Sequence, residues 1–220
     1  MGKLRAISTP VFLSLALILY IIILTAGGML GVVSSFGAIV LCFLYALLQG
    51  KQGDKWILAG LACTVGADFC LVVCDPRQQL WGMVFFLIVQ SLYAVKLYRE
   101  DPNTLLLILR VALILLIEGI AVLVLREKTD ALALISVCYY ANLILNIVAA
   151  FRQFRSKPIF PIALVLFLLC DTVIGLQVAA GGYLPIGEDS WLYRLIFMNF
   201  NLSWFFYLPS QVLIALSSKK

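Results

Sequence analysis

The chain has 220 residues, of which 64% are hydrophobic and only 12% charged, and its formal net charge is +5. A soluble domain carries about 25% charged residues, so this composition excludes a soluble globular protein and indicates one domain embedded in a membrane. The basic residues lie in short stretches between apolar runs, a distribution that orients membrane helices rather than binding nucleic acid.

Eight apolar runs follow one another along the chain, each close to the ~20 residues that a membrane-spanning helix needs. Short breaks with glycine, proline or charged residues separate them, so neighbouring helices are expected to be antiparallel. The sequence therefore predicts an all-α, polytopic transmembrane helical bundle of about eight helices, in a single domain over residues 1–220. The predicted spans are 10–27, 30–49, 55–74, 79–98, 103–125, 131–151, 159–180 and 194–216.

The basic residues are distributed unequally between the two sides that this topology creates. Eleven of the 16 lie at the termini or in the even-numbered connections, which eight spans place on one side. Because positive charge is enriched on the cytoplasmic side, both termini are predicted to be cytoplasmic, in a multi-pass protein of a bacterial-type cell membrane.

The first span has an alternative interpretation as a cleaved signal peptide. Lys3 and Arg5 would form its basic start, 11–24 its apolar core and 25–27 a small-residue cleavage site. The charge asymmetry is better explained when this helix is retained, so retention is the prediction.

The residue types that remain restrict the possible chemistry. The chain has no histidine, which excludes Ser-His-Asp and Cys-His catalysis and a histidine-based zinc site. Its six cysteines include no Cys-x-x-Cys pair and are expected to be small packing residues rather than disulfides or ligands. We therefore expect no metal and no organic cofactor.

Two carboxylates lie deep inside apolar runs. Asp68 is the fourteenth residue of the third predicted span and Asp171 the thirteenth of the seventh. These two spans run in the same direction, so at ~1.5 Å per residue the two side chains are at nearly equal depth. Intramembrane carboxylates are costly and are functional candidates by default. We predict that both line one interior pocket.

Other polar residues gather at compatible depths on the fourth, sixth and eighth spans. Single amides in membranes often serve as interhelical hydrogen bonds, whereas groups near a carboxylate pair can bind substrate. The predicted site comprises Asp68 and Asp171 as catalytic residues, with Gln90, Tyr93, Asn142, Tyr207 and Gln211 as substrate-binding residues. Arg110 and Glu118 in the fifth span are interpreted as structural, with either mutual neutralisation or partners on other helices left open.

Four segments carry a resemblance to a known family. Residues 60–71 (GLACTVGADFCL) resemble the motif GLxxSxxGDxxL of the YhhN-like membrane proteins, the lysoplasmalogenase family. Residues 82–93 are similar to its GxxxFxxxHxxY, residues 167–171 to its FxxSD, and residues 207–217 to its YxxxQxLIxxS. The four motifs occur in the family's order and span most of the chain.

Three positions depart from the family pattern. Gln90 occupies the histidine position, Ala67 the position of the glycine before the first aspartate, and Cys170 that of the serine before the second. Both aspartates and the Tyr207 and Gln211 pair match the motifs.

The resemblance implies a lysophospholipid-like membrane lipid as substrate and cleavage of its vinyl-ether bond, giving a fatty aldehyde and a glycerophospho-alcohol. Such a reaction requires one protonated and one ionised carboxyl group, the arrangement that hydrolyses glycosidic bonds. Two alternatives remain open: a small membrane carrier, in which the aspartates relay protons or bind cargo, and a non-catalytic lipid-binding protein.

Overall fold

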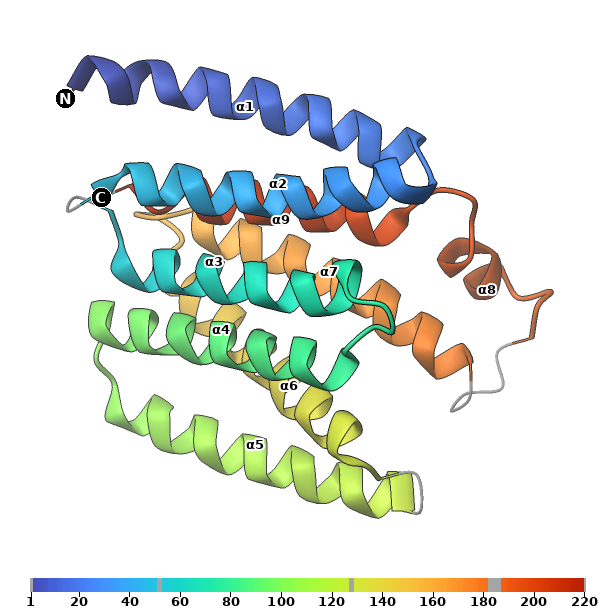
Figure 1. The fold of residues 1–220 in the computed structure, drawn as a ribbon. Coiled ribbons are helices and arrows are strands. Elements are labelled where there is room, and N and C mark those ends of the chain that lie inside the picture. The colour runs from blue at the N-terminus through green and yellow to red at the C-terminus, as the bar shows by residue number, and fades with distance from the viewer. Residues whose placement is uncertain (1, 51–52, 127–128, 182–186, 220) are drawn as a thin grey trace.

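The computed structural model describes residues 2–50, 53–126, 129–181 and 187–219, and the side chains of all of these except 2–8 and 125 (Figure 1). Over these residues the chain is helical without a named strand. The helices are α1 (Gly2–Thr25), α2 (Gly28–Leu48), α3 (Lys55–Asp68), α4 (Gln79–Glu100), α5 (Thr104–Leu125), α6 (Ala131–Phe151), α7 (Ile159–Ala180), α8 (Trp191–Ile196) and α9 (Leu202–Leu216). A π-helical turn, Phe69–Val73, extends α3.

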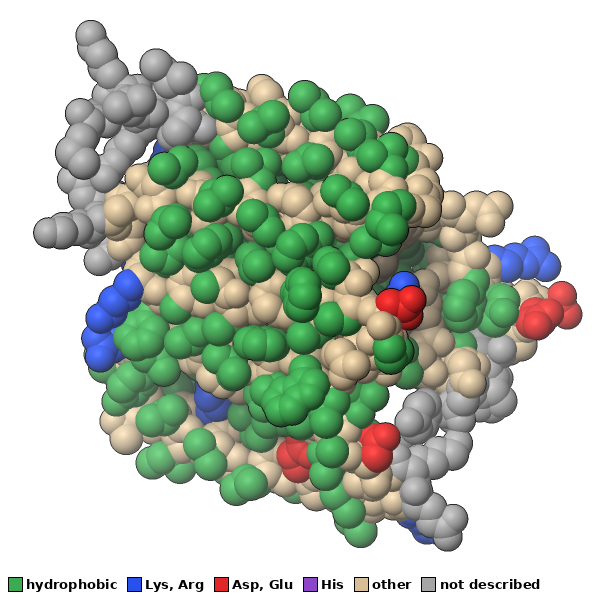
Figure 2. All heavy atoms as spheres, in the orientation of Figure 1, with side chains coloured by type: hydrophobic (Ala, Val, Ile, Leu, Met, Phe, Trp, Pro, Cys, Tyr) green, Lys and Arg blue, Asp and Glu red, His purple; other side chains and the backbone are tan. Residues whose placement is uncertain are grey.

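Among the described residues, six helices are long and apolar enough to cross a membrane: α2, α3 with its π-helical extension, α4, α5, α6 and α7. The apolar part of α1 (Thr9–Thr25) and α9 are shorter apolar helices in the described chain. Apolar side chains cover the face seen in Figure 2, and few charged groups interrupt them. The predicted all-α membrane bundle is confirmed.

Polar caps explain where several helices begin. Asp54 accepts a 2.8 Å hydrogen bond from the backbone N–H of Trp56, and Asn103 accepts one of 3.0 Å from that of Leu106. Asp130 does the same for α6, at 2.7 Å from the N–H of Ala133. These side chains satisfy backbone donors that a helix start leaves free. Asp54 and Asp130 directly precede predicted spans, and Asn103 is the first residue of one.

The helices pack as a bundle in which α1 lies on α2 at one edge and α5 lies on α6 at the other (Figure 1). The interior is formed mainly by α7 against α9, α3 against α4, and α4 against α6. Both chain termini lie at the same end of the bundle (Figure 1), and Lys219 Nζ donates a 2.7 Å hydrogen bond to Thr9 Oγ1 there. We call this the terminal end.

The region predicted as one span over 194–216 is divided in the structure. Helix α8 ends at Ile196 and α9 begins only at Leu202. Asn201 precedes α9 and accepts a 3.4 Å hydrogen bond from the N–H of Trp204. Asparagine favours cap positions over helix interiors, so the chain leaves the helix here although its flanks stay apolar. Helix α1, in contrast, begins earlier than its predicted span 10–27, at Gly2.

Candidate functional site

Asp68 is the last residue of α3, immediately before the π-helical turn, and is only 3% exposed. The hydroxyl of Tyr207, on α9, donates a 2.8 Å hydrogen bond to its Oδ2. π-Helical turns occur often at functional sites. A buried carboxyl is thus fixed by a partner far away in the sequence.

Asp171, in the middle of α7, has an analogous partner. The hydroxyl of Tyr139, on α6, donates a short hydrogen bond to Asp171 Oδ2. Asp171 is half-buried, whereas Asp68 is fully buried. Each aspartate is therefore held by one tyrosine from a different helix.

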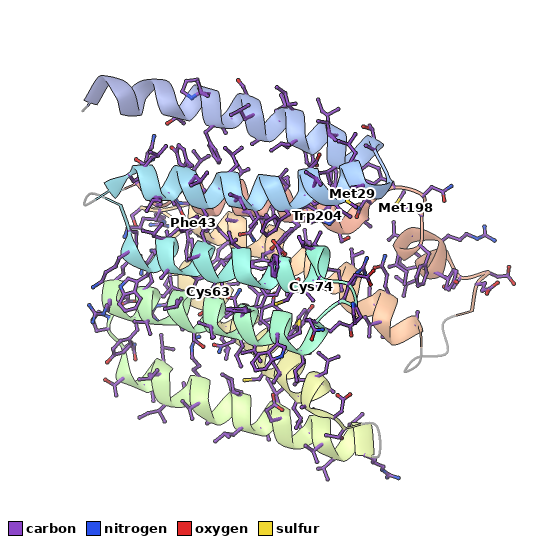
Figure 3. All side chains as sticks on the ribbon, viewed as in Figure 1. Met29, Phe43, Cys63, Cys74, Met198 and Trp204 are labelled. Atoms are coloured by element: carbon purple, nitrogen blue, oxygen red, sulfur yellow. The ribbon has the colours of Figure 1, made fainter. Side chains whose placement is uncertain are left out.

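Four aromatic rings join these two tyrosine–aspartate pairs, and we call them the aromatic cluster: Phe86, Tyr139, Phe167 and Tyr207. The Phe167 ring centroid lies 5.5 Å from that of Tyr207, 6.5 Å from that of Tyr139 and 5.6 Å from that of Phe86. These distances are typical of packed aromatic pairs. Trp204, labelled in Figure 3, extends the cluster along α9, with its ring 5.0 Å from that of Tyr207.

The two carboxyl groups share this region of the interior. Tyr207, which binds Asp68, and Tyr139, which binds Asp171, both pack against the ring of Phe167. The structure thus brings together the two aspartates and Tyr207 from the predicted site.

The predicted amides lie about one helical turn from the aromatic cluster, toward the terminal end. Gln90 follows Phe86 by four residues, Asn142 follows Tyr139 by three, and Gln211 follows Tyr207 by four. Helices α4, α6 and α9 all run toward that end, as the 2.9 Å ion pair of Asp101 with Arg152 and the 2.8 Å bond from Asp54 N to Ser218 O show. We call Gln90, Asn142, Asn146 and Gln211 the amide layer.

Hydrogen bonds connect part of the amide layer to α5. Asn146 donates to both the backbone oxygen and Oε1 of Gln90, at 2.8 and 2.9 Å. Arg110 donates to Oδ1 of Asn142 and of Asn146, at 2.7 and 2.8 Å. For Arg110 the sequence left open neutralisation by Glu118 or partners on other helices, and the structure shows partners on another helix. Asn142 therefore uses its carbonyl oxygen to hold Arg110.

Several buried polar atoms in this interior have no hydrogen-bond partner among the described residues. They are Nε2 of Gln90, the hydroxyl of Tyr93 and Oε1 of Gln211. All three residues are fully buried, and leaving such a group unpaired costs about 1–3 kcal/mol. These are groups that a polar ligand or water can satisfy.

Tyr139 is the site residue that was absent from the sequence prediction. Its residue type is common in apolar helices, and no charge marks it. The available signal was its spacing, because Tyr139, Asn142 and Asn146 recur at intervals of three and four residues and so share one face of α6.

A pocket that neither aspartate lines is found at the terminal end. Its volume is about 460 Å³, and its walls are Ala46, Gly50, Gly53, Asp54, Lys55, Trp56, Leu58, Lys96, Arg99 and Glu100. The pocket shared by both aspartates therefore remains a prediction. Within the described chain, no three Cys, Asp or Glu residues are grouped as metal ligands, and all six cysteines are free.

Comparison with known proteins gives one family match. The model of the YhhN family matches residues 31–218, which is most of the chain and includes both tyrosine–aspartate pairs. No curated protein and no solved structure matches the chain.

Proposed function

The chain belongs to the YhhN family, the lysoplasmalogenase family, and on this basis we propose that it is a membrane hydrolase that cleaves the vinyl-ether bond of a lysoplasmalogen-type lipid. The products are a fatty aldehyde and a glycerophospho-alcohol. The observation that supports this reaction, beyond family membership, is the presence of two aspartates that are each hydrogen-bonded to a tyrosine.

That pair supplies the two groups that the reaction needs. Cleavage begins when a neutral acid gives a proton to the outer carbon of the vinyl ether, so that the carbon bonded to oxygen becomes an oxocarbenium ion. A carboxylate nearby stabilises this cation and accepts a proton from the attacking water. Two carboxyl groups close together in a low-dielectric site favour a state with one proton on one of them. The support for this arrangement is that the tyrosines bound to Asp68 and Asp171 belong to one aromatic cluster.

The remaining steps balance without a cofactor. Water adds to the cationic carbon to form a hemiacetal, and the carboxylate takes the proton that the water loses. The hemiacetal then breaks its bond to the glycerol oxygen, which takes the proton that the second carboxyl gained from water, while the first carboxylate takes the proton of the hemiacetal hydroxyl as the aldehyde forms. One water molecule is consumed, and each aspartate returns to its starting state.

The surrounding residues have supporting roles in this proposal. Tyr207 and Tyr139 orient the carboxyl groups through their hydrogen bonds. The aromatic rings provide an apolar wall for the alkenyl chain and face the developing cation, which aromatic faces attract. Gln90 and Gln211, with their unpartnered amide atoms, and Tyr93, with its unpartnered hydroxyl, are candidates to bind the glycerol hydroxyl or water.

A direct assay tests the reaction. Purified protein in detergent is given a lysoplasmalogen, and aldehyde release is measured against a lysophospholipid with an ester-linked acyl chain. We expect aldehyde from the vinyl ether and no fatty acid from the ester, because protonation at carbon requires the carbon–carbon double bond. If the vinyl-ether lipid yields no aldehyde, the hydrolase is excluded in favour of a carrier or a lipid-binding protein.

A further inference from the structure

The pocket at the terminal end is built from charged and aromatic residues that the proposed reaction does not use. It lies between the end of α2, the start of α3 and the end of α4, and its volume of about 460 Å³ is in the range of small-molecule sites, ~300–1,000 Å³. Lys55, Lys96 and Arg99 supply three positive charges to its walls, and Asp54 and Glu100 supply two negative ones.

Three of the charged residues in the pocket wall form ion pairs with one another. Lys96, which is 4% exposed, lies 2.9 Å from Glu100 and 3.7 Å from Asp54. Glu100 has a second cation, Lys157, at 2.6 Å, and Asp54 accepts the backbone N–H groups at the start of α3. The carboxylates of the pocket are therefore occupied.

The other two cations of the pocket, Lys55 and Arg99, lie beside an aromatic ring instead of a carboxylate. Lys55 Nζ lies 5.2 Å and the guanidinium of Arg99 lies 5.0 Å from the ring centroid of Trp56. Both side chains are exposed, and in the described part of the chain neither has a carboxylate within 4.0 Å. Trp56 thus lies close to two cations of the pocket wall that have no carboxylate partner among the described residues.

We propose that this pocket binds the phosphate of a membrane phospholipid headgroup between Lys55 and Arg99. Arginine and lysine both bind phosphate, arginine with a fork of donors. Basic pockets at a membrane surface recognise anionic headgroups, and tryptophan is enriched at that level. Leu47 and Leu48, next to the pocket wall on α2, are 47% and 66% exposed and offer an apolar surface to the lipid chains.

This site is separate from the aspartate pair. Lys55 is the first and Asp68 the last residue of the 14-residue helix α3, so at ~1.5 Å per residue they lie roughly 20 Å apart. The phosphate and the vinyl ether of a lysoplasmalogen are attached to the same glycerol, a few bonds apart. One substrate molecule cannot reach both sites, so the pocket binds a second lipid.

Lipid binding to the full-length protein in detergent tests the proposal. Affinity for short-chain phosphatidylglycerol is measured by native mass spectrometry on the wild type and on the Lys55→Ala/Arg99→Ala variant. A cation near the membrane surface contributes a factor of about five to binding of an anionic lipid, so we expect affinity to fall roughly 25-fold. The Arg152→Ala/Arg155→Ala variant removes two charges outside the pocket and should bind as the wild type does.

Equal losses in the two double variants would overturn the proposal, because they would indicate general attraction to the basic end. Unchanged affinity in Lys55→Ala/Arg99→Ala would also overturn it. Inorganic phosphate should not displace the lipid at equal concentration; if it does, the pocket is a site for free phosphate and the lipid is not its ligand. Asp68→Asn should bind phosphatidylglycerol like the wild type, which separates this result from the outcome of the hydrolysis assay.

Discussion

The hydroxyl of Tyr207 donates a 2.8 Å hydrogen bond to Oδ2 of Asp68, joining two helices through residues 139 positions apart in the chain. Tyr139 holds Asp171 in the same way. Because both tyrosines also belong to the aromatic cluster, the position of each carboxyl depends on the packing of the rings. The predictions below test separately what the hydroxyl groups, the packing and the carboxyl groups contribute to turnover and stability.

The tyrosine hydroxyls are expected to matter for turnover more than for stability. Tyr207→Phe and Tyr139→Phe keep the ring and remove the hydrogen bond to the aspartate. Loss of a hydrogen bond to a charged group costs about 1.5–3 kcal/mol, so if it acts in the transition state, aldehyde release should fall roughly 10- to 100-fold.

Tyr140→Phe is the matched control for these two variants. Tyr140 lies next to Tyr139 on α6, but its hydroxyl is bonded at 2.7 Å to Thr172 Oγ1 and not to an aspartate. Its turnover should stay close to that of the wild type. Equal losses in all three variants would assign the effect to general packing.

A glycine to alanine change tests how tightly α3 and α4 pack. A Cβ added at Gly60 would lie 2.4 Å from Cε1 and 2.9 Å from the hydroxyl of Tyr93, which is fully buried. Overpacking of this kind costs about 1–3 kcal/mol, so Gly60→Ala should lower the melting temperature in detergent. Gly37→Ala, where nothing lies within 4 Å, should leave it unchanged or raise it, since alanine favours a helix by about 1 kcal/mol.

The sequence predicted the membrane helices well, because hydropathy and the length of apolar runs determine them. Asp54, Asn103 and Asp130 lie at the breaks between apolar runs and do cap the helices that follow. The division of 194–216 was missed because the residues between α8 and α9 include Phe197 and Phe200, so hydropathy stays high across the break.

The partners of the site residues could not be predicted from the sequence. Depth along a helix follows from counting, but rotation about the helix axis depends on neighbours that are distant in the chain. The face of α6 that carries Asn142 and Asn146 was visible in their spacing, whereas Arg110 as their shared partner was not. The same limit applies to Tyr139 and Asp171.

Two ion pairs at the terminal end should contribute very differently to stability. The Lys96 side chain is 5% exposed and interacts with Asp54 and Glu100, whereas Arg152 and Asp101 are 46% and 41% exposed. Removing one partner of a buried pair costs about 3–5 kcal/mol, while an exposed pair contributes about 0–1 kcal/mol. Lys96→Met should therefore lower the free energy of unfolding in detergent strongly and Arg152→Met only slightly. Similar small effects of both variants would contradict the buried network.

The last prediction concerns the aspartates. Asp68→Asn and Asp171→Asn keep the shape and hydrogen-bonding capacity of each side chain while removing the acid or base. Loss of general acid–base catalysis typically lowers a rate ~10²- to 10⁴-fold, so each single variant should lose nearly all aldehyde release. Replacing a buried charge by a neutral amide removes a desolvation cost, so the melting temperature should hold or rise.

Glu118→Gln provides the matched control for these two variants. Glu118 is also an intramembrane carboxylate, but it lies on α5, outside the aromatic cluster, and neither tyrosine of the site is bonded to it. Its substitution should leave aldehyde release close to the wild-type rate. The measurement pairs thermal stability with aldehyde release for the wild type and all three variants. An Asp68→Asn or Asp171→Asn protein that folds and retains wild-type turnover would end the two-carboxylate mechanism, because neither step of the hydrolysis proceeds at full rate without its proton donor or acceptor.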